Sequence, residues 1–339
     1  MTTESTTPYP PQATAPRRLH IGVTPWGHGG SDDLRDLIRQ ARLAESLGFD
    51  SFFIPESHLH AQARPAPLIV LAALAGATER IQLGTTSLLL PLRDPLLLAE
   101  EIATLDHLSN GRLILGLGRG FRPGTFDAFG VDPRCKRERF EQVLATMLRA
   151  WGLEPAWAGA PGATEQGVAR VEPSPLQRPH PPLWLAAFGP KAIAQAARLG
   201  LPYFASPMES LAAIDENYRA YRELSQQVGA VPVMRTLFVS DDSTERHAVA
   251  HALRLEREAL ARSRARVGSR SVEADEAVEG SAVVGDRESA ITGIREILRR
   301  LGPTHLIART PGGVDQRAAE RSLRALASIR SGLDVGTMT

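Results

Sequence analysis

One short stretch of the chain places an arginine between two glycines at the end of an apolar run. Residues 111–121 read Gly-Arg-Leu-Ile-Leu-Gly-Leu-Gly-Arg-Gly-Phe, and the apolar part is typical of a buried parallel strand. Gly118 and Gly120 flank Arg119 and let the backbone turn sharply and approach a ligand closely. A guanidinium at such a turn suits a phosphate group, because its planar fork donates two parallel hydrogen bonds. An arginine at a strand end can equally be a surface charge, so its surroundings must decide.

Two histidines, His58 and His60, follow the apolar segment Asp50–Ile54. An imidazole titrates near neutral pH, so both are candidate catalytic residues for proton transfer. The alternative for His58 is a hydrogen bond within its own loop. We expect no metal site, because no third ligand is evident near the pair.

These residues need a scaffold that brings strand ends together, and strand-like and helix-like segments alternate from Leu19 onward. The eight strand candidates are Leu19–Thr24, Asp50–Ile54, Ile81–Leu90, Leu113–Leu117, Leu183–Ala187, Leu201–Ala205, Val233–Val239 and Thr304–Ala308. Helical patterns such as Asp32–Leu47 and Pro95–Leu108 lie between them. Eight such units predict an α/β fold of the (β/α)8 TIM barrel type. The alternative, a doubly wound open sheet, usually has fewer strands.

Composition shifts divide the chain into one domain, two tails and an insertion. Residues 1–17 are rich in Thr and Pro and predict a disordered tail. Residues 18–332 form the single barrel domain, and 333–339 form a C-terminal tail. Residues 243–285 follow the seventh strand, begin as a helix and become polar. This insertion is a candidate lid over the barrel mouth or an insertion without function.

The overall composition excludes several classes of protein. The 339 residues carry a formal net charge of +1, which predicts no nucleic-acid partner. A single cysteine, Cys135, excludes an internal disulfide and a multi-cysteine metal site. No apolar run approaches the length of a membrane span, and no signal peptide is evident. We expect a cytoplasmic protein without a membrane partner.

Three segments together resemble the bacterial luciferase-like flavin monooxygenases. The most specific runs through Pro91-Leu-Arg-Asp-Pro95, Ala99-Glu-Glu101 and Leu105-Asp-His-Leu-Ser-Asn-Gly-Arg112 into Gly116-Leu-Gly-Arg-Gly120. Gly48-Phe-Asp-Ser-Phe-Phe-Ile-Pro-Glu56 and Pro181-Pro-Leu-Trp-Leu-Ala-Ala-Phe-Gly189 are similar to two other parts of the family. The resemblance covers roughly residues 18–329. It implies a (β/α)8 barrel, in agreement with the strand count.

The resemblance implies that reduced FMN, or a deazaflavin in one branch, binds at the carboxyl ends of the strands. Arg119 matches the arginine that reaches the flavin phosphate, and Arg137 matches a second basic residue near it. Phe188 and Gly189 match positions whose backbone amides touch the phosphate. The alternative for Arg137 is a solvated arginine that pairs with Glu141 along a helix.

The flavin ring is expected to lie over the third strand. There Thr86 and Ser87 match a place where the family has a non-prolyl cis peptide bond; without the resemblance, an ordinary strand would be expected. The luciferase subunit has a reactive cysteine where this chain has Gly118, which leaves more room at the flavin edge. The family's Glu-His-His reads Glu56-Ser57-His58 here, and these departures put luciferase-like aldehyde chemistry in doubt.

The resemblance thus implies an FMN-dependent monooxygenase that oxygenates a small organic substrate through a flavin peroxide. Reduced FMN would come from a separate flavin reductase, and family members commonly pair as dimers, so we expect a homodimer. Arg119 favours FMN, because deazaflavin members commonly carry a smaller residue and an acidic group there. The alternatives are a deazaflavin-dependent hydride-transfer oxidoreductase and a non-catalytic flavin-binding partner subunit.

Overall fold

The computed structural model describes residues 18–27, 31–158, 169–225, 229–265 and 282–333. The expected tail at 1–17 and most of the expected C-terminal tail lie outside these ranges. Leu333 is an exception: we assigned it to the tail, but it is 2% exposed and packs in the core. Its apolar side chain belongs to the folded domain.

The strands form one parallel sheet that closes into a barrel. In chain order they are β1 (His20–Val23), β2 (Ser51–Ile54), β3 (Gln82–Leu89), β4 (Leu113–Gly118), β5 (Leu183–Ala186), β6 (Tyr203–Phe204), β7 (Pro232–Val239), β8 (Ala282–Gly285) and β9 (His305–Arg309). Their order in the sheet is β6-β5-β4-β3-β2-β1-β9-β7-β8. A bridge between Ala205 and Val233 joins the end of β6 to β7, which closes a ring of eight strands. The predicted TIM barrel is confirmed.

The ninth strand, β8, was not predicted. It lies in the segment that we described only as a polar insertion, and it pairs with Thr236–Val239, the second half of β7. The first half of β7, Pro232–Thr236, pairs instead with β9. β8 therefore stands outside the ring, as an extra strand on an extension of β7.

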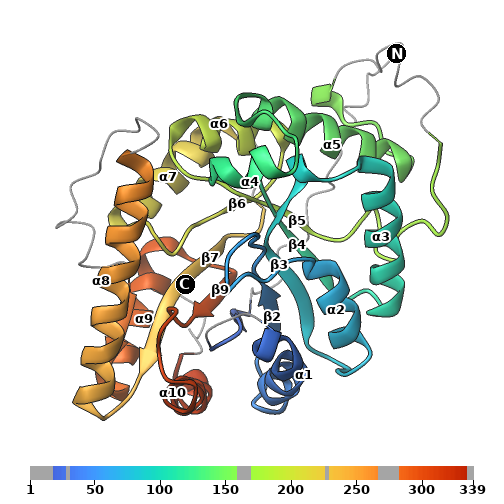
Figure 1. The fold of residues 1–339 in the computed structure, drawn as a ribbon. Coiled ribbons are helices and arrows are strands. Elements are labelled where there is room, and N and C mark those ends of the chain that lie inside the picture. The colour runs from blue at the N-terminus through green and yellow to red at the C-terminus, as the bar shows by residue number, and fades with distance from the viewer. Residues whose placement is uncertain (1–17, 28–30, 159–168, 226–228, 266–281, 334–339) are drawn as a thin grey trace, which may run out of the picture.

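The helices alternate with the strands and surround them (Figure 1). They are α1 (Ser31–Ser46), α2 (Pro67–Ala75), α3 (Pro95–Leu108), α4 (Pro123–Ala128), α5 (Lys136–Ala150), α6 (Pro190–Leu199), α7 (Leu211–Leu224), α8 (Ser243–Ala265), α9 (Arg287–Leu301) and α10 (Gln316–Ile329). The Asp94 side chain caps α3 by accepting hydrogen bonds from the Leu96 and Leu97 amides. Helix α8 belongs to the insertion and lies at the left edge of Figure 1.

The core has two layers, as a filled barrel requires. A small cluster of Phe53, Ile114, Trp184, Phe204, Met234 and Ile307 comes from alternate positions on the ring strands and fills the interior. The remaining buried apolar side chains form one large cluster between the sheet and the helices. Within the described ranges, no helix has the length and apolar character that a membrane span needs.

Arg112, within the stretch that resembles the family, ties the start of β4 to neighbouring elements. Its guanidinium donates to the carbonyl oxygens of Ser109 (2.6 Å), Ile81 (3.0 Å) and Ala75 (3.0 Å). It also donates to Thr78, at the side-chain Oγ1 (2.9 Å) and at the carbonyl oxygen (3.2 Å). This arginine therefore fixes the base of the strand whose other end carries Arg119.

Candidate functional site

Three cationic side chains gather where β4 ends and α5 and α6 begin. Arg119 follows β4, and Lys136 and Arg137 open α5. Arg137 Nη1 donates to the carbonyl oxygen of Lys191 (3.0 Å), which links the start of α5 to the first turn of α6. Lys136 Nζ lies 3.4 Å from the carbonyl oxygen of Gly120. Lys136 was missed in the sequence, although it is adjacent to Arg137.

The positive charges of this cluster repel one another. Burial, together with the charge of Arg137, lowers the pKa of Arg119 to about 10, against a smaller opposite effect of Glu141. Burial and the charges of Arg119 and Arg137 also lower the pKa of Lys136. Arg119 therefore remains protonated near pH 7, at some cost in free energy. Cations held together in this way create a positive potential that attracts anions.

The start of α6 faces open space beside these cations. Gly189 is the N-cap of α6 with a φ of 78°, and a Cβ added there would meet no heavy atom of the described residues within 4 Å. Phe188, one residue earlier, is 43% exposed. The free amides of a helix N-terminus attract an anion. The structure thus brings Arg119, Arg137 and Gly189, predicted as phosphate residues, to one place.

The third strand has the predicted cis peptide bond between Thr86 and Ser87. The register of β3 against β4 shifts between Thr86 and Leu88. Gly118 on β4 packs directly on this irregular part of β3, because a Cβ added there would lie 2.0 Å from Ser87 Oγ. Thr86 Oγ1 lies 3.9 Å from the sulfur of Met234, a barrel-interior residue. The strand segment expected under a flavin ring therefore borders the barrel interior.

A buried carboxylate, Glu56, anchors His58. Glu56 is fully buried, and its Oε1 lies 2.7 Å from His58 Nε2 and accepts a hydrogen bond from Arg93 Nη2 at 2.5 Å. Its Oε2 accepts the amide of Leu89 (2.7 Å). Burial alone would raise the pKa of Glu56, but the His58 hydrogen bond, the Arg93 charge and the Leu89 amide outweigh it and lower that pKa. His58 also packs edge-on against Phe129, with ring centroids 5.0 Å apart.

The loop that carries both histidines is closed at its ends by Ser57 and Arg64. The Ser57 amide donates to the Arg64 carbonyl oxygen (3.2 Å), and the Arg64 amide donates to Ser57 Oγ (3.1 Å). His60 Nε2 is buried and has no hydrogen-bond partner among the described residues. Burial and the nearby charges of Arg122 and His58 lower the pKa of His60. His60 is therefore neutral at pH 7.

Leu89 joins the histidine loop to the cation cluster. Its amide binds Glu56, and its side chain lies 3.4 Å from an added Cβ at Gly118 and 3.7 Å from one at Gly120. These glycines flank Arg119. The two predicted groups of site residues thus share one face of the barrel, at the carboxyl ends of β2, β3 and β4. Glu56 and Arg93 were missed as site residues in the sequence.

The insertion after β7 is tied to the barrel through α8. Glu256 of α8 forms an ion pair with Arg309, the last residue of β9, and Arg309 Nη1 also lies 3.6 Å from the sulfur of Met208. The part of the candidate lid at 266–281 lies outside the described residues.

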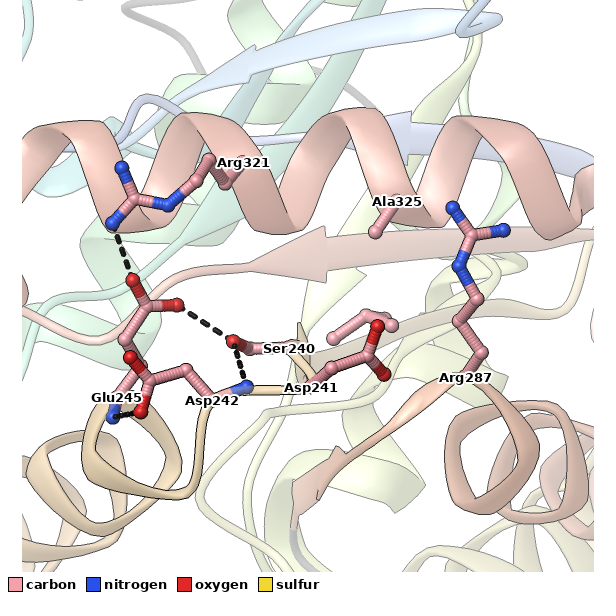
Figure 2. A pocket seen from close by; sticks show the side chains of 8 residues that line it. Ser240, Asp241, Asp242, Glu245, Arg287, Arg321 and Ala325 are labelled. Carbon is pink, nitrogen blue, oxygen red and sulfur yellow. Dashed lines mark hydrogen bonds and ion pairs between the residues drawn. The ribbon is translucent and has the colours of Figure 1, made fainter.

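A separate polar pocket of about 410 Å³ lies between the end of β7 and helices α9 and α10 (Figure 2). Figure 2 shows Arg321 directed at Glu245, whose other oxygen accepts a hydrogen bond from Ser240 Oγ at 2.6 Å. The lining contains none of the predicted site residues. Among the described residues, no group of three or more metal-ligating side chains occurs there or elsewhere.

Comparison with known proteins identifies a family that this chain matches over most of its length. A family model described as luciferase-like monooxygenase matches residues 19–305. An uncharacterized protein from Sinorhizobium fredii is 32% identical over 221 residues, which are 62% of this chain and 62% of the relative. The oxygenase component of flavin-dependent trigonelline monooxygenase from Acinetobacter baylyi is 25% identical over 227 residues, 64% of this chain and 62% of that protein. The chain thus spans 62% of the length of these two curated relatives.

A solved structure, monooxygenase RslO1 from Streptomyces bottropensis, superposes with a TM-score of 0.76 at 25% identity. The superposition covers 91% of this chain and 98% of that one.

Proposed function

The chain belongs to the luciferase-like monooxygenase family, and we propose that it is an FMN-dependent monooxygenase that oxygenates a small organic substrate. Membership supports a flavin-dependent oxidoreductase. The finer proposal is that the flavin is reduced FMN, that a separate reductase supplies it, and that dioxygen is the second substrate. The name of the trigonelline enzyme's oxygenase component is consistent with such a two-component arrangement.

The observation that carries the proposal is the cation cluster beside the open start of α6. Arg119, Lys136 and Arg137 supply the charge that a phosphate group needs, and Gly189 leaves space for it. The residues present therefore fit the phosphate end of FMN. The bound reduced flavin supplies the activation of dioxygen, and the protein supplies binding, orientation and exclusion of water.

The other predicted site residues have roles that follow from their places. Thr86, Ser87 and Gly118 would support the flavin ring, because they form the irregular part of β3 and the strand packed on it. His58, with Nε2 held by Glu56, keeps Nδ1 for a hydrogen bond to the substrate. His60 would present a neutral ring in the same loop.

We also propose a homodimer, which the surface of α2 and α3 supports. Three large apolar side chains on these two packed helices are strongly exposed: Ile69 (75%), Leu97 (55%) and Leu108 (60%). Exposed apolar side chains on neighbouring helices are typical of interaction surfaces.

Anaerobic titration of the purified protein with dithionite-reduced FMN tests the cofactor proposal. We expect saturable binding that Arg119→Ala weakens about tenfold or more, the scale of one lost charge-assisted hydrogen bond. Arg134→Ala is the matched control, because Arg134 lies nearby with its side chain 87% exposed and paired with Asp132. Equal binding by the two variants would contradict the phosphate assignment. Binding of a deazaflavin in place of FMN would overturn the choice of cofactor.

A further inference from the structure

Arg119 is oriented by a neutral side chain rather than by a carboxylate. Its Nη1 donates to Gln195 Oε1 (3.1 Å), and Gln195 is buried at 3% exposure in α6. In the part of the chain that the structure describes, Arg119 makes no other hydrogen bond and no ion pair. A guanidinium has five N–H donors, so most of its hydrogen-bonding capacity remains available to a ligand.

The nearest carboxylate, Glu141, lies behind Gln195. Gln195 Nε2 donates to Glu141 Oε1 (2.6 Å), and the same oxygen accepts a hydrogen bond from Arg198. Because Glu141 can only accept and Arg119 can only donate, the two bonds fix which way the Gln195 amide points. The row Glu141–Gln195–Arg119 therefore orients the arginine while it keeps the negative charge one side chain away. Arg198, not Arg119, pairs with that charge.

The charged groups around Arg119 come from three elements. Lys136, Arg137 and Glu141 lie on α5, Arg198 lies on α6, and Arg119 itself follows β4. With Glu141 paired to Arg198, three cations remain without a partner carboxylate among the described residues. Three cations attract the two charges of a terminal phosphate monoester more strongly than the single charge of a phosphodiester.

We infer that Gln195 is a positioning residue that keeps Glu141 from neutralising Arg119, and that the cation excess selects a dianionic phosphate monoester. The inference rests on the proposed function, since it concerns the same flavin-phosphate site. It adds that the site distinguishes cofactors by the charge of their phosphate. It also makes binding depend on pH, because a phosphate monoester loses its second proton at about pH 6.

Three flavins of similar size differ in the charge of their phosphate group: reduced riboflavin has no phosphate, reduced riboflavin 4′,5′-cyclic phosphate carries one charge there, and reduced FMN carries two. The reduced ring is the same in all three, so the affinities are compared as ratios at each pH. At pH 7.5 we expect affinity to rise in that order. Between pH 7.5 and 5, the affinity for FMN should fall toward that for the cyclic phosphate, while the ratio of the other two affinities changes little. At the alkaline end, affinity for both phosphates should fall as Lys136 and Arg119 lose their protons, the pKa of Arg119 being about 10.

Gln195→Glu places a carboxylate on Arg119 and tests the role of the amide. We expect it to lower the affinity for FMN about tenfold or more, on the scale of a lost charge-assisted hydrogen bond, and to leave riboflavin binding unchanged. Gln195→Met removes both hydrogen bonds without adding charge, so it should lose less than Gln195→Glu. Gln142→Glu adds the same charge at an exposed position of α5 and is the control.

The outcomes separate the inference from the proposed function. If the wild type binds FMN no more tightly than riboflavin, the phosphate site and the proposed function fail together. If it prefers FMN but Gln195→Glu behaves like Gln142→Glu, the role of Gln195 is wrong and the phosphate site stands. If FMN and the cyclic phosphate bind equally at pH 7.5, the selection for a dianion is wrong. Circular dichroism of each variant shows whether it is folded. If Gln195→Glu is misfolded, the FMN affinity of Gln195→Met is compared with that of the wild type instead.

Discussion

Replacing Arg93 by methionine would leave the Glu56 carboxylate buried without its cation. Glu56 is fully buried and Arg93 is 22% exposed, with 2.5 Å between Nη2 and Oε1. Removing one partner of a buried ion pair costs about 3–5 kcal/mol. Glu56 keeps the hydrogen bonds to His58 and to the Leu89 amide, so we expect the lower end, about 3 kcal/mol. Urea unfolding followed by circular dichroism should show the midpoint falling by about 1 M.

The loss of stability in Arg93→Met should depend on pH, and the pKa of Glu56 determines the direction of that dependence. That pKa lies below the ordinary 4.5 in the folded protein, so the carboxylate contributes stability that is present above pH 4.5. This contribution is lost as pH falls through the lower folded value. Without Arg93 the folded pKa rises. The difference in unfolding free energy between wild type and variant should therefore be full at pH 7 and shrink below about pH 4.5.

Arg299→Met provides the control for this prediction. Arg299 pairs with Glu296 at 2.8 Å, but the two side chains are 65% and 44% exposed. Exposed pairs contribute little, so the control should unfold at the wild-type midpoint. A wild-type midpoint for Arg93→Met, or a loss that stays constant down to pH 4, would refute the account of Glu56 as a charge stabilised by Arg93.

Three further substitutions test other parts of the structure. Gly118→Ala should lower the free energy of unfolding by about 1–3 kcal/mol, because the added methyl group overlaps the Ser87 side chain. Gly124→Ala is the control, because its methyl group contacts nothing among the described residues and should not destabilise the fold. Urea unfolding compares the two variants. Arg112→Lys should lose about 2–3 kcal/mol in the same assay, because lysine cannot reproduce the forked hydrogen bonds, and unchanged stability would show that these bonds are replaceable. Leu97→Glu should shift the protein from dimer to monomer in sedimentation velocity, whereas Leu224→Glu, at a similarly exposed residue of α7, should not.

The barrel was predictable because its strands carry a strong pattern. Buried parallel strands read as continuous apolar runs such as Leu113–Leu117, and each of the eight predicted runs lies on a strand of the ring. The missed strand, Ala282–Gly285, has four residues and pairs only outside the ring. Its neighbours in the sequence are polar. Its partner is an extension of β7, and no local sequence pattern predicts that this extension pairs with another strand. Strand pairing, not composition, makes this segment a strand.

The sequence pointed to candidate site residues only where they lie next to a glycine-marked segment or match the family. Gly118 and Gly120 marked Arg119, and the resemblance supplied Arg137, Gly189 and the cis bond after Thr86. Partners that are distant in the chain gave no such signal. Arg93 meets Glu56 across 37 positions, and Gln195 meets Arg119 across 76. Which carboxylate or amide reaches which cation depends on how strands and helices pack, and spacing in the sequence does not encode it.

The two carboxylates of the proposed site, Glu56 and Glu141, differ in how they meet the neighbouring arginines. Glu56 contacts Arg93 directly, so that guanidinium is already neutralised and serves to fix His58. Glu141 is held off Arg119 by Gln195 and is matched by Arg198 instead. If Glu141 paired with Arg119 instead, the cluster would lose one positive charge, and Arg119 would lose its free hydrogen-bond donors. The same two residue types therefore form a buried ion pair beside His58 and, at the start of α6, leave Arg119 without a carboxylate partner among the described residues.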